Sequence, residues 1–212
     1  MNSKQIMPRR GILEEIGNAV THGVGSLFAI FAFILMLINS ETNTQIISSV
    51  IYFVGMLMMF TMSCLYHAFK TDSKVKRLFR RFDYLSIYLL IGATYTPILL
   101  CYIGGTFGIV MCSIQWAIII FGVTMIGVFG PNRIKWLHFT LYIILGWCGV
   151  IFFPQLIKNL TFFLLILGGG IIYTAGIIPF ALKNKVAHFI WHFFVLFGAI
   201  VQWIGIYITI YL

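Results

Sequence analysis

Three histidines, placed in two apolar stretches of the sequence, have the types and spacing of a metal site. His188 and His192 are four residues apart and so share one face of a helix, and His67 ends a separate apolar run. Three neutral histidines are the protein ligands of an open zinc centre whose fourth position takes water. Zinc lowers the pKa of such a water to about 7, which makes it a nucleophile at neutral pH. The set therefore predicts a zinc site, although ligand type alone also suits iron or another divalent ion.

Asp83 and Ser63 are the side chains we expect to act beside this metal. Asp83 is one of five acidic residues, and it is the acidic residue that we place within a membrane span. It would accept a hydrogen bond from a metal-binding histidine, orient the bound water or act as a general base. Ser63 lies one turn before His67 and would hydrogen-bond that water or a substrate carbonyl. The alternatives are an interfacial ion pair of Asp83 with Arg81 and, for the histidines, hydrogen bonds between helices.

Two further histidines are expected to have other roles. His22 lies four residues after Asn18 on the same helix face, which favours a hydrogen bond between helices. His138 stands near Trp136 at a predicted membrane boundary, where a hydrogen bond between helices or an interfacial position is the simpler interpretation. We therefore leave both out of the predicted ligand set.

The elements that must position these residues are membrane spans. In this chain of 212 residues, 61% are hydrophobic and 9% are charged, which excludes a soluble globular domain. About 20 apolar residues cross a bilayer, and seven stretches are long enough. We predict an all-α integral membrane protein, a single seven-transmembrane helix bundle over residues 1–212. The spans lie near 16–38, 46–69, 82–103, 107–129, 134–153, 159–182 and 187–210.

The distribution of basic residues predicts the orientation of this bundle. Thirteen of the 14 lysines and arginines fall on one side of the predicted membrane, and Lys158 falls on the other. The positive-inside rule then places the N-terminus in the cytoplasm and the C-terminus outside, in a multi-pass protein of the cell membrane. His67, Asp83, His188 and His192 consequently share one depth near the inner leaflet. The net charge of +9 reflects topology and contact with membrane lipids rather than binding of nucleic acid.

Three segments raise questions of local structure. Residues 74–82 mix bases with Leu78, Phe79 and Phe82, which fits either a short interfacial helix or a solvated loop. Pro97 is expected to bend the third span. Three consecutive glycines at 168–170 predict an irregular sixth span.

Four motifs in order give the chain a resemblance to a known family. They are Glu15-x-x-Asn18-x-x-Thr21-His22, Ser63-x-x-x-His67, Asp83-Tyr84 leading into Tyr88-Leu-Leu-Ile-Gly-Ala-Thr-Tyr-Thr-Pro97, and His188-x-x-x-His192. They resemble the hemolysin III family, the bacterial branch of the progestin and adipoQ receptor family, which is related to alkaline ceramidases. The order Ile-Gly-Ala-Thr stands where the family has Ile-Ala-Gly-Thr, and the ligand positions are unaffected.

The resemblance implies a seven-helix bundle with zinc near the inner leaflet. Zinc would be held by His67, His188 and His192, with Asp83 acting through the bound water and Ser63 beside it. Glu15, Asn18 and His22 would have structural roles or support the ligands from behind.

The resemblance leaves three functions open. The family name implies a pore-forming cytolysin, the receptors imply a sensor or regulator of membrane state with a structural zinc, and the ceramidases imply hydrolysis of a lipid amide or ester. The residues favour hydrolysis, because an adjacent carboxylate and serine exceed what folding requires. The few charges within the spans argue against a wide aqueous pore through one monomer. The sequence predicts no oligomeric state.

Overall fold

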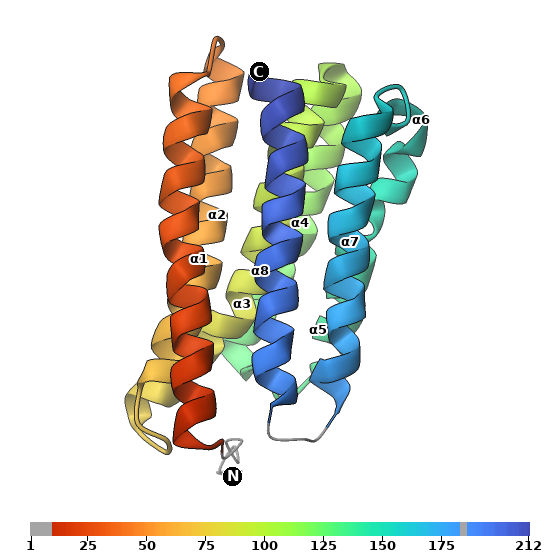
Figure 1. Cartoon of the computed structure of the whole chain (residues 1–212). Helices are drawn as coiled ribbons and strands as arrows, with labels where there is room; N and C mark the ends of the chain where they lie inside the picture. The colour runs from red at the N-terminus through yellow and green to blue at the C-terminus, as the bar shows by residue number, and fades with distance from the viewer. Residues whose placement is uncertain (1–9, 183–185) are drawn as a thin grey trace.

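The chain folds into a bundle of long apolar helices, seen in a computed structural model that describes residues 10–182 and 186–212. Seven helices are long and apolar enough to cross a membrane, which confirms the predicted seven-helix fold (Figure 1). Lys4, Arg9, Lys183 and Lys185, counted above for orientation, lie outside the described residues. The elements are α1 (Ile12–Ile38), α2 (Asn43–Ala68), α3 (Lys74–Pro97), η1 (Ile98–Ile103), α4 (Gly105–Phe129), α5 (Lys135–Gly146), η2 (Cys148–Phe152), α6 (Phe153–Leu156), α7 (Leu160–Ala181), α8 (Ala187–Ile206) and η3 (Tyr207–Tyr211).

Side-chain caps fix where several helices begin. Thr42 and Gln45 form a reciprocal capping box at the start of α2. Ser73 accepts a hydrogen bond from the backbone N–H of Lys76 at the start of α3, and Asn159 accepts one from that of Phe162 at the start of α7. The turns between the spans are short, and consecutive spans run in opposite directions. The described chain therefore begins at one end of the bundle and ends at the other (Figure 1).

The third span begins earlier than the sequence predicts. Residues 74–82 form the first turns of α3, which rules out the solvated-loop interpretation of this basic segment. Lys76 and Arg80 are buried there, because partners from α1 and from the loop after α4 reach them. After Pro97 the backbone continues as the π-helix η1 and ends at Gly104, where φ is +64°.

The irregular span is the fifth rather than the sixth. α7 runs as one α-helix through Gly168, Gly169 and Gly170, so the predicted irregularity there is wrong. Gly169 allows α7 to approach α8, since a Cβ at this position would lie 3.0 Å from the carbonyl oxygen of Gly198. In the fifth span, by contrast, α5 is followed by the 3₁₀ turn η2 and the short α6.

Tyr95 holds the break in the fifth span together. Its hydroxyl donates to the carbonyl oxygen of Gly146 (2.7 Å) and accepts from the backbone N–H of Gly149 (3.0 Å). These two bonds satisfy backbone groups that the interrupted helix leaves free, which hydrocarbon surroundings require.

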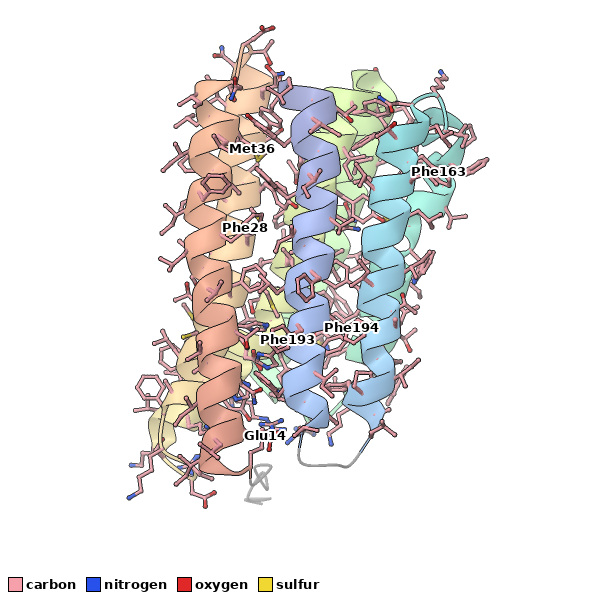
Figure 2. All side chains as sticks on the ribbon, viewed as in Figure 1. Glu14, Phe28, Met36, Phe163, Phe193 and Phe194 are labelled. Atoms are coloured by element: carbon pink, nitrogen blue, oxygen red, sulfur yellow. The ribbon has the colours of Figure 1, made fainter. Side chains whose placement is uncertain are left out.

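The bundle has an aromatic and Met-rich interior and an apolar exterior. Tyr52, Met56 and Phe60 of α2 are fully buried, and α1 meets α8 where Phe28 contacts Trp203 edge to face. Large aliphatic and aromatic side chains are exposed along the outer faces, as lipid surroundings allow. Nitrogen and oxygen atoms gather instead at the N-terminal end of α1, near Glu14 (Figure 2).

Candidate metal centre

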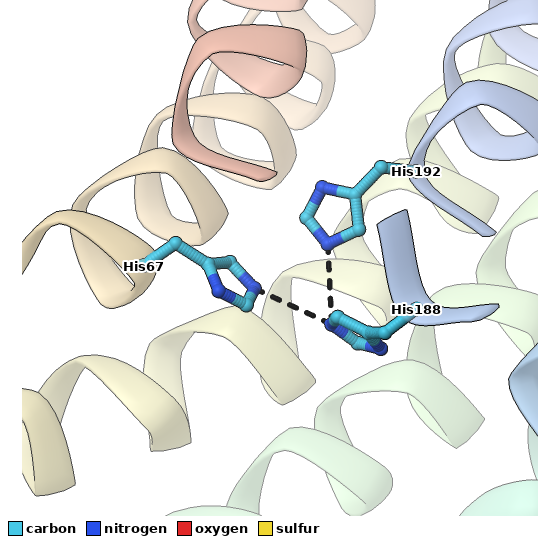
Figure 3. A group of neighbouring side chains, drawn as sticks. All are labelled: His67, His188 and His192. Atoms are coloured by element: carbon cyan, nitrogen blue, oxygen red, sulfur yellow. Dashed lines mark hydrogen bonds between the residues drawn. The ribbon is translucent and has the colours of Figure 1, made fainter. Parts of the chain in front are cut away.

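His67 from the last turn of α2 meets His188 and His192 from the first turns of α8 (Figure 3). Nε2 of His188 lies 3.4 Å from Nε2 of His67 and 3.2 Å from Nε2 of His192. One ring nitrogen of each histidine lies within 4.8 Å of the others. His67 and His192 are buried, at 2% and 1% exposure.

The separations of these nitrogens fit a tetrahedral metal ion. Zinc–nitrogen bonds of about 2.0–2.1 Å give a tetrahedron with edges of about 3.3 Å. The His188–His67 and His188–His192 separations match such an edge. The His67–His192 separation is at most 4.8 Å, so a small movement of one ring would bring it to the same length. The three histidines can therefore hold a metal ion.

A carboxylate from α1 orients the first of these histidines. Nδ1 of His67 donates to Oε2 of Glu15 at 2.5 Å, and the amide nitrogen of Asn18 lies 3.3 Å from the same ring nitrogen. Oε1 of Glu15 accepts from Nζ of Lys76 at 3.0 Å. A proton on Nδ1 leaves the lone pair of Nε2 facing the other two histidines. This carboxylate–histidine arrangement is the usual support of a metal-binding imidazole.

His22 lies beside the cluster without joining it. Its ring stacks on that of His192, with 3.8 Å between centroids, and meets Phe60 edge to face. Neither ring nitrogen has a hydrogen-bond partner within the described part of the chain, so the predicted hydrogen bond of His22 is not seen there. His22 therefore fixes the plane of the His192 ring by stacking.

Asp83 and Ser63 lie on the open side of the histidine cluster. Both line a cavity of about 400 Å³ that His188 and His192 also line, and the Ser63 hydroxyl lies close enough to the Asp83 carboxylate to stabilise its charge. The guanidinium of Arg81, the alternative partner of Asp83, donates instead to the carbonyl oxygen of Gly127 at 3.3 Å. The structure thus brings all five proposed metal-site residues to one place.

The cavity extends from the histidines toward the middle of the bundle between α3, α5, α7 and α8. Its walls beyond Asp83 are largely apolar or aromatic. Phe139 of α5, with Thr174 and Phe180 of α7, line it and are themselves exposed. The cavity therefore reaches the outer surface between α5 and α7, where the surroundings are lipid.

Comparison with known proteins gives the family. The family model described as haemolysin-III related matches residues 10–203. The chain is 36% identical over 205 residues to Hemolysin-3 of Bacillus cereus, covering 94% of this chain and 93% of that protein. It is 37% identical over 195 residues to a Hemolysin-3 homolog of Bacillus subtilis (strain 168), covering 89% and 90%. The chain belongs to the haemolysin-III-related family. With its seven apolar helices, this haemolysin-III-related protein is a multi-pass protein of the cell membrane.

Two residues of this haemolysin-III-related protein have contacts that sequence reasoning did not assign. His138 is 2% exposed and lines the cavity, and its Nδ1 lies 3.1 Å from the hydroxyl of Tyr88, a contact between α5 and α3. Lys76, one of the basic residues of the segment 74–82, is the buried partner of Glu15. A signal for Lys76 existed, because positions 76, 80, 83 and 87 follow the spacing of one helix face.

Proposed function

We propose that the protein is a zinc-dependent hydrolase that cleaves an ester or amide bond of a membrane lipid near the inner leaflet. The observation that carries the proposal is the shared cavity, where three converging histidines, a carboxylate and a hydroxyl border a largely apolar space of about 400 Å³. A metal ion with a structural role alone would not need an apolar cavity, suited to an acyl chain, beside the histidines. The inner-leaflet placement rests on the predicted cytoplasmic N-terminus.

Each side chain has a task in this hydrolysis. His67, His188 and His192 would hold the metal, and Glu15 keeps His67 in position through Nδ1. A zinc ion bound there would polarise the scissile carbonyl and acidify a water molecule. Asp83 takes the proton of the attacking water and returns it to the departing amine or alcohol as the ester or amide bond breaks. Ser63 stabilises the charge of the Asp83 carboxylate from beside it.

The first experiment measures metal content and turnover together. Purified protein is analysed for zinc, and then incubated with long-chain lipid amides and esters while released fatty acid is followed by mass spectrometry. Wild type is expected to carry zinc and release fatty acid, and His67→Ala, His188→Ala and His192→Ala to lose both. Asp83→Asn is expected to retain zinc and stability and lose turnover. Full cellular function of an Asp83→Asn protein that still binds zinc would favour a regulator with a structural zinc.

A second candidate function comes from the relatives, which carry the name Hemolysin-3. In that case the protein would permeabilise membranes as an oligomer. Dye-loaded liposomes with osmotic protectants of graded size test this function. Leakage equal to that of an unrelated seven-span protein would remove it.

A further inference from the structure

Arg80 is a buried cation with unused hydrogen-bond donors at the end of the cavity. It is 6% exposed and lines the cavity. Its Nη2 donates to Oδ1 of Asn132 at 3.0 Å, whereas Nε and Nη1 have no hydrogen-bond partner in the described part of the chain. Lys76, one turn earlier on α3, is by contrast bound by Glu15 and by the backbone carbonyl oxygens of His67 and Phe69. The two buried cations therefore differ in what they still can bind.

Arg80 forms no ion pair with a carboxylate in the described part of the chain. The segments outside it, 1–9 and 183–185, contain no Asp or Glu. The charge of Asp83 attracts Arg80 from one turn further along α3, but the two groups do not form an ion pair. Among the other acidic residues, Glu14 pairs with Arg10 and Glu15 with His67 and Lys76, while Glu41 and Asp72 are exposed. A buried charge without a direct counter-ion costs several kcal/mol, on the order given for one ion removed from water.

The surroundings of Arg80 favour an anion with an apolar tail. Arg10 and Lys135 line the same cavity and add positive charge. A guanidinium with free N–H groups matches two oxygens of a phosphate. The cavity continues from there between apolar walls and reaches lipid between α5 and α7. A phosphate joined to an acyl chain meets both conditions.

We propose that Arg80 binds the phosphate of a phospholipid headgroup, with an acyl chain of the same lipid in the cavity beside Asp83. Arg80 precedes Asp83 by three residues, about 4.5 Å along the helix. A phosphate at Arg80 thus brings the ester bonds of a glycerophospholipid, a few covalent bonds away, to the side chains around Asp83. The substrate class is then a phosphate-bearing lipid, an assignment that rests on the hydrolytic function proposed above; the binding of phosphate does not.

A binding experiment tests the site without turnover. Fluorophore-labelled phosphatidylglycerol is titrated with purified protein in a neutral detergent, and diacylglycerol with the same chains and label serves as the phosphate-free probe. Arg80→Gln is expected to weaken binding of phosphatidylglycerol roughly 10- to 100-fold, as loss of charge-assisted hydrogen bonds predicts, and to leave diacylglycerol binding unchanged. Arg77→Gln, an exposed position on the same helix, is the matched control and is expected to bind like wild type.

A second variant and a comparison of lipids complete the binding experiment. If Arg80→Gln does not fold, Arg80→Lys is used, which keeps the charge without the planar fork and is expected to bind phosphatidylglycerol more weakly than wild type. In wild type, phosphatidylglycerol is expected to bind at least tenfold more tightly than diacylglycerol. Equal binding of the two lipids, equal losses in Arg77→Gln and Arg80→Gln, or displacement of the probe by inorganic phosphate at the same concentration as by unlabelled lipid would each overturn the proposal.

The two proposals fail in different ways. Arg80-dependent binding without cleavage of any lipid would leave the phosphate site standing and remove the hydrolase. Cleavage of a phosphate-free lipid at the same rate in wild type and Arg80→Gln would support the hydrolase and remove the phosphate site.

Discussion

Replacing Glu15 by Gln tests whether the contact behind His67 tunes the metal site. Glu15 accepts from Nδ1 of His67 at 2.5 Å, with the His67 side chain fully buried and the Glu15 side chain 12% exposed. A hydrogen bond to a charged group contributes about 1.5–3 kcal/mol and a neutral one about 0.5–1.5 kcal/mol. The loss of roughly 1.4 kcal/mol on replacing carboxylate by amide corresponds to about tenfold weaker zinc binding. That value agrees with the roughly 10- to 100-fold known for groups behind metal ligands.

Lys76 complicates this variant, because Glu15→Gln leaves its ammonium without a carboxylate. Lys76 is 1% exposed, and removing one partner of a buried ion pair costs about 3–5 kcal/mol of folding free energy. The double variant Glu15→Gln/Lys76→Met removes both charges. It is expected to recover thermal stability relative to Glu15→Gln and to keep the weakened zinc affinity.

The assay is competition for zinc between the purified protein and a chromophoric chelator at fixed pH, with thermal unfolding measured in parallel. Glu14→Gln is the matched control, since Glu14 precedes Glu15 and pairs with Arg10 at 3.4 Å. Its zinc affinity is expected to stay within about twofold of wild type, because Glu14 pairs with Arg10 and shares no direct contact with a histidine of the cluster. Wild-type zinc affinity in the double variant, or equal losses in both glutamate variants, would refute the reasoning.

Three further predictions concern stability, measured by thermal unfolding in detergent. Gly55→Ala is expected to cost about 1–3 kcal/mol of unfolding free energy through overpacking, and so to lower the melting temperature, because the added methyl group would overlap Ala93. Gly127→Ala, with open space around it, is expected to melt at or above wild type. Equal melting temperatures of the two variants would contradict this. Tyr95→Phe is expected to cost about 1–3 kcal/mol, since it leaves two backbone groups at the break of the fifth span without partners, and unchanged melting would argue against that role. A chelator is expected to lower the melting temperature of wild type, because it removes a ligand of the folded state, and to leave His192→Ala unaffected; an equal shift in both would count against the metal centre.

The sequence predicts the helices better than their ends or their breaks. Hydropathy locates seven spans because length and apolar content dominate insertion into a bilayer. It misplaces the start of α3 because Lys76 and Arg80 count against a span. In the structure Lys76 pairs with Glu15, and Arg80 donates a hydrogen bond to Asn132. The break after Gly146 has no strong sequence signal, since its stabilising group is the hydroxyl of a tyrosine two helices earlier.

For the site too, the sequence predicts some features and not others. The i, i+4 spacing of His188 and His192 and the shared depth of His67 can be read from one chain, and they suffice to propose the cluster. The contact of Glu15 with Nδ1 of His67 cannot be predicted from the sequence, because it depends on how α1 packs against α2. The stacking of His22 on His192 likewise depends on the packing of α1 against α8.

The two sides of the histidine cluster differ in a way that bears on whether a zinc ion there would cut a bond or hold helices together. A closed structural zinc site takes four protein ligands, whereas a catalytic site keeps one position open. Among the described residues three histidines converge, and His22, the nearest spare imidazole, stacks on His192 instead of adding a nitrogen. The back of the cluster is filled by Glu15, and the front faces a cavity with Asp83. An ion that served only to join α2 to α8 would need neither the open front nor the carboxylate on it, so the asymmetry favours a reactive centre.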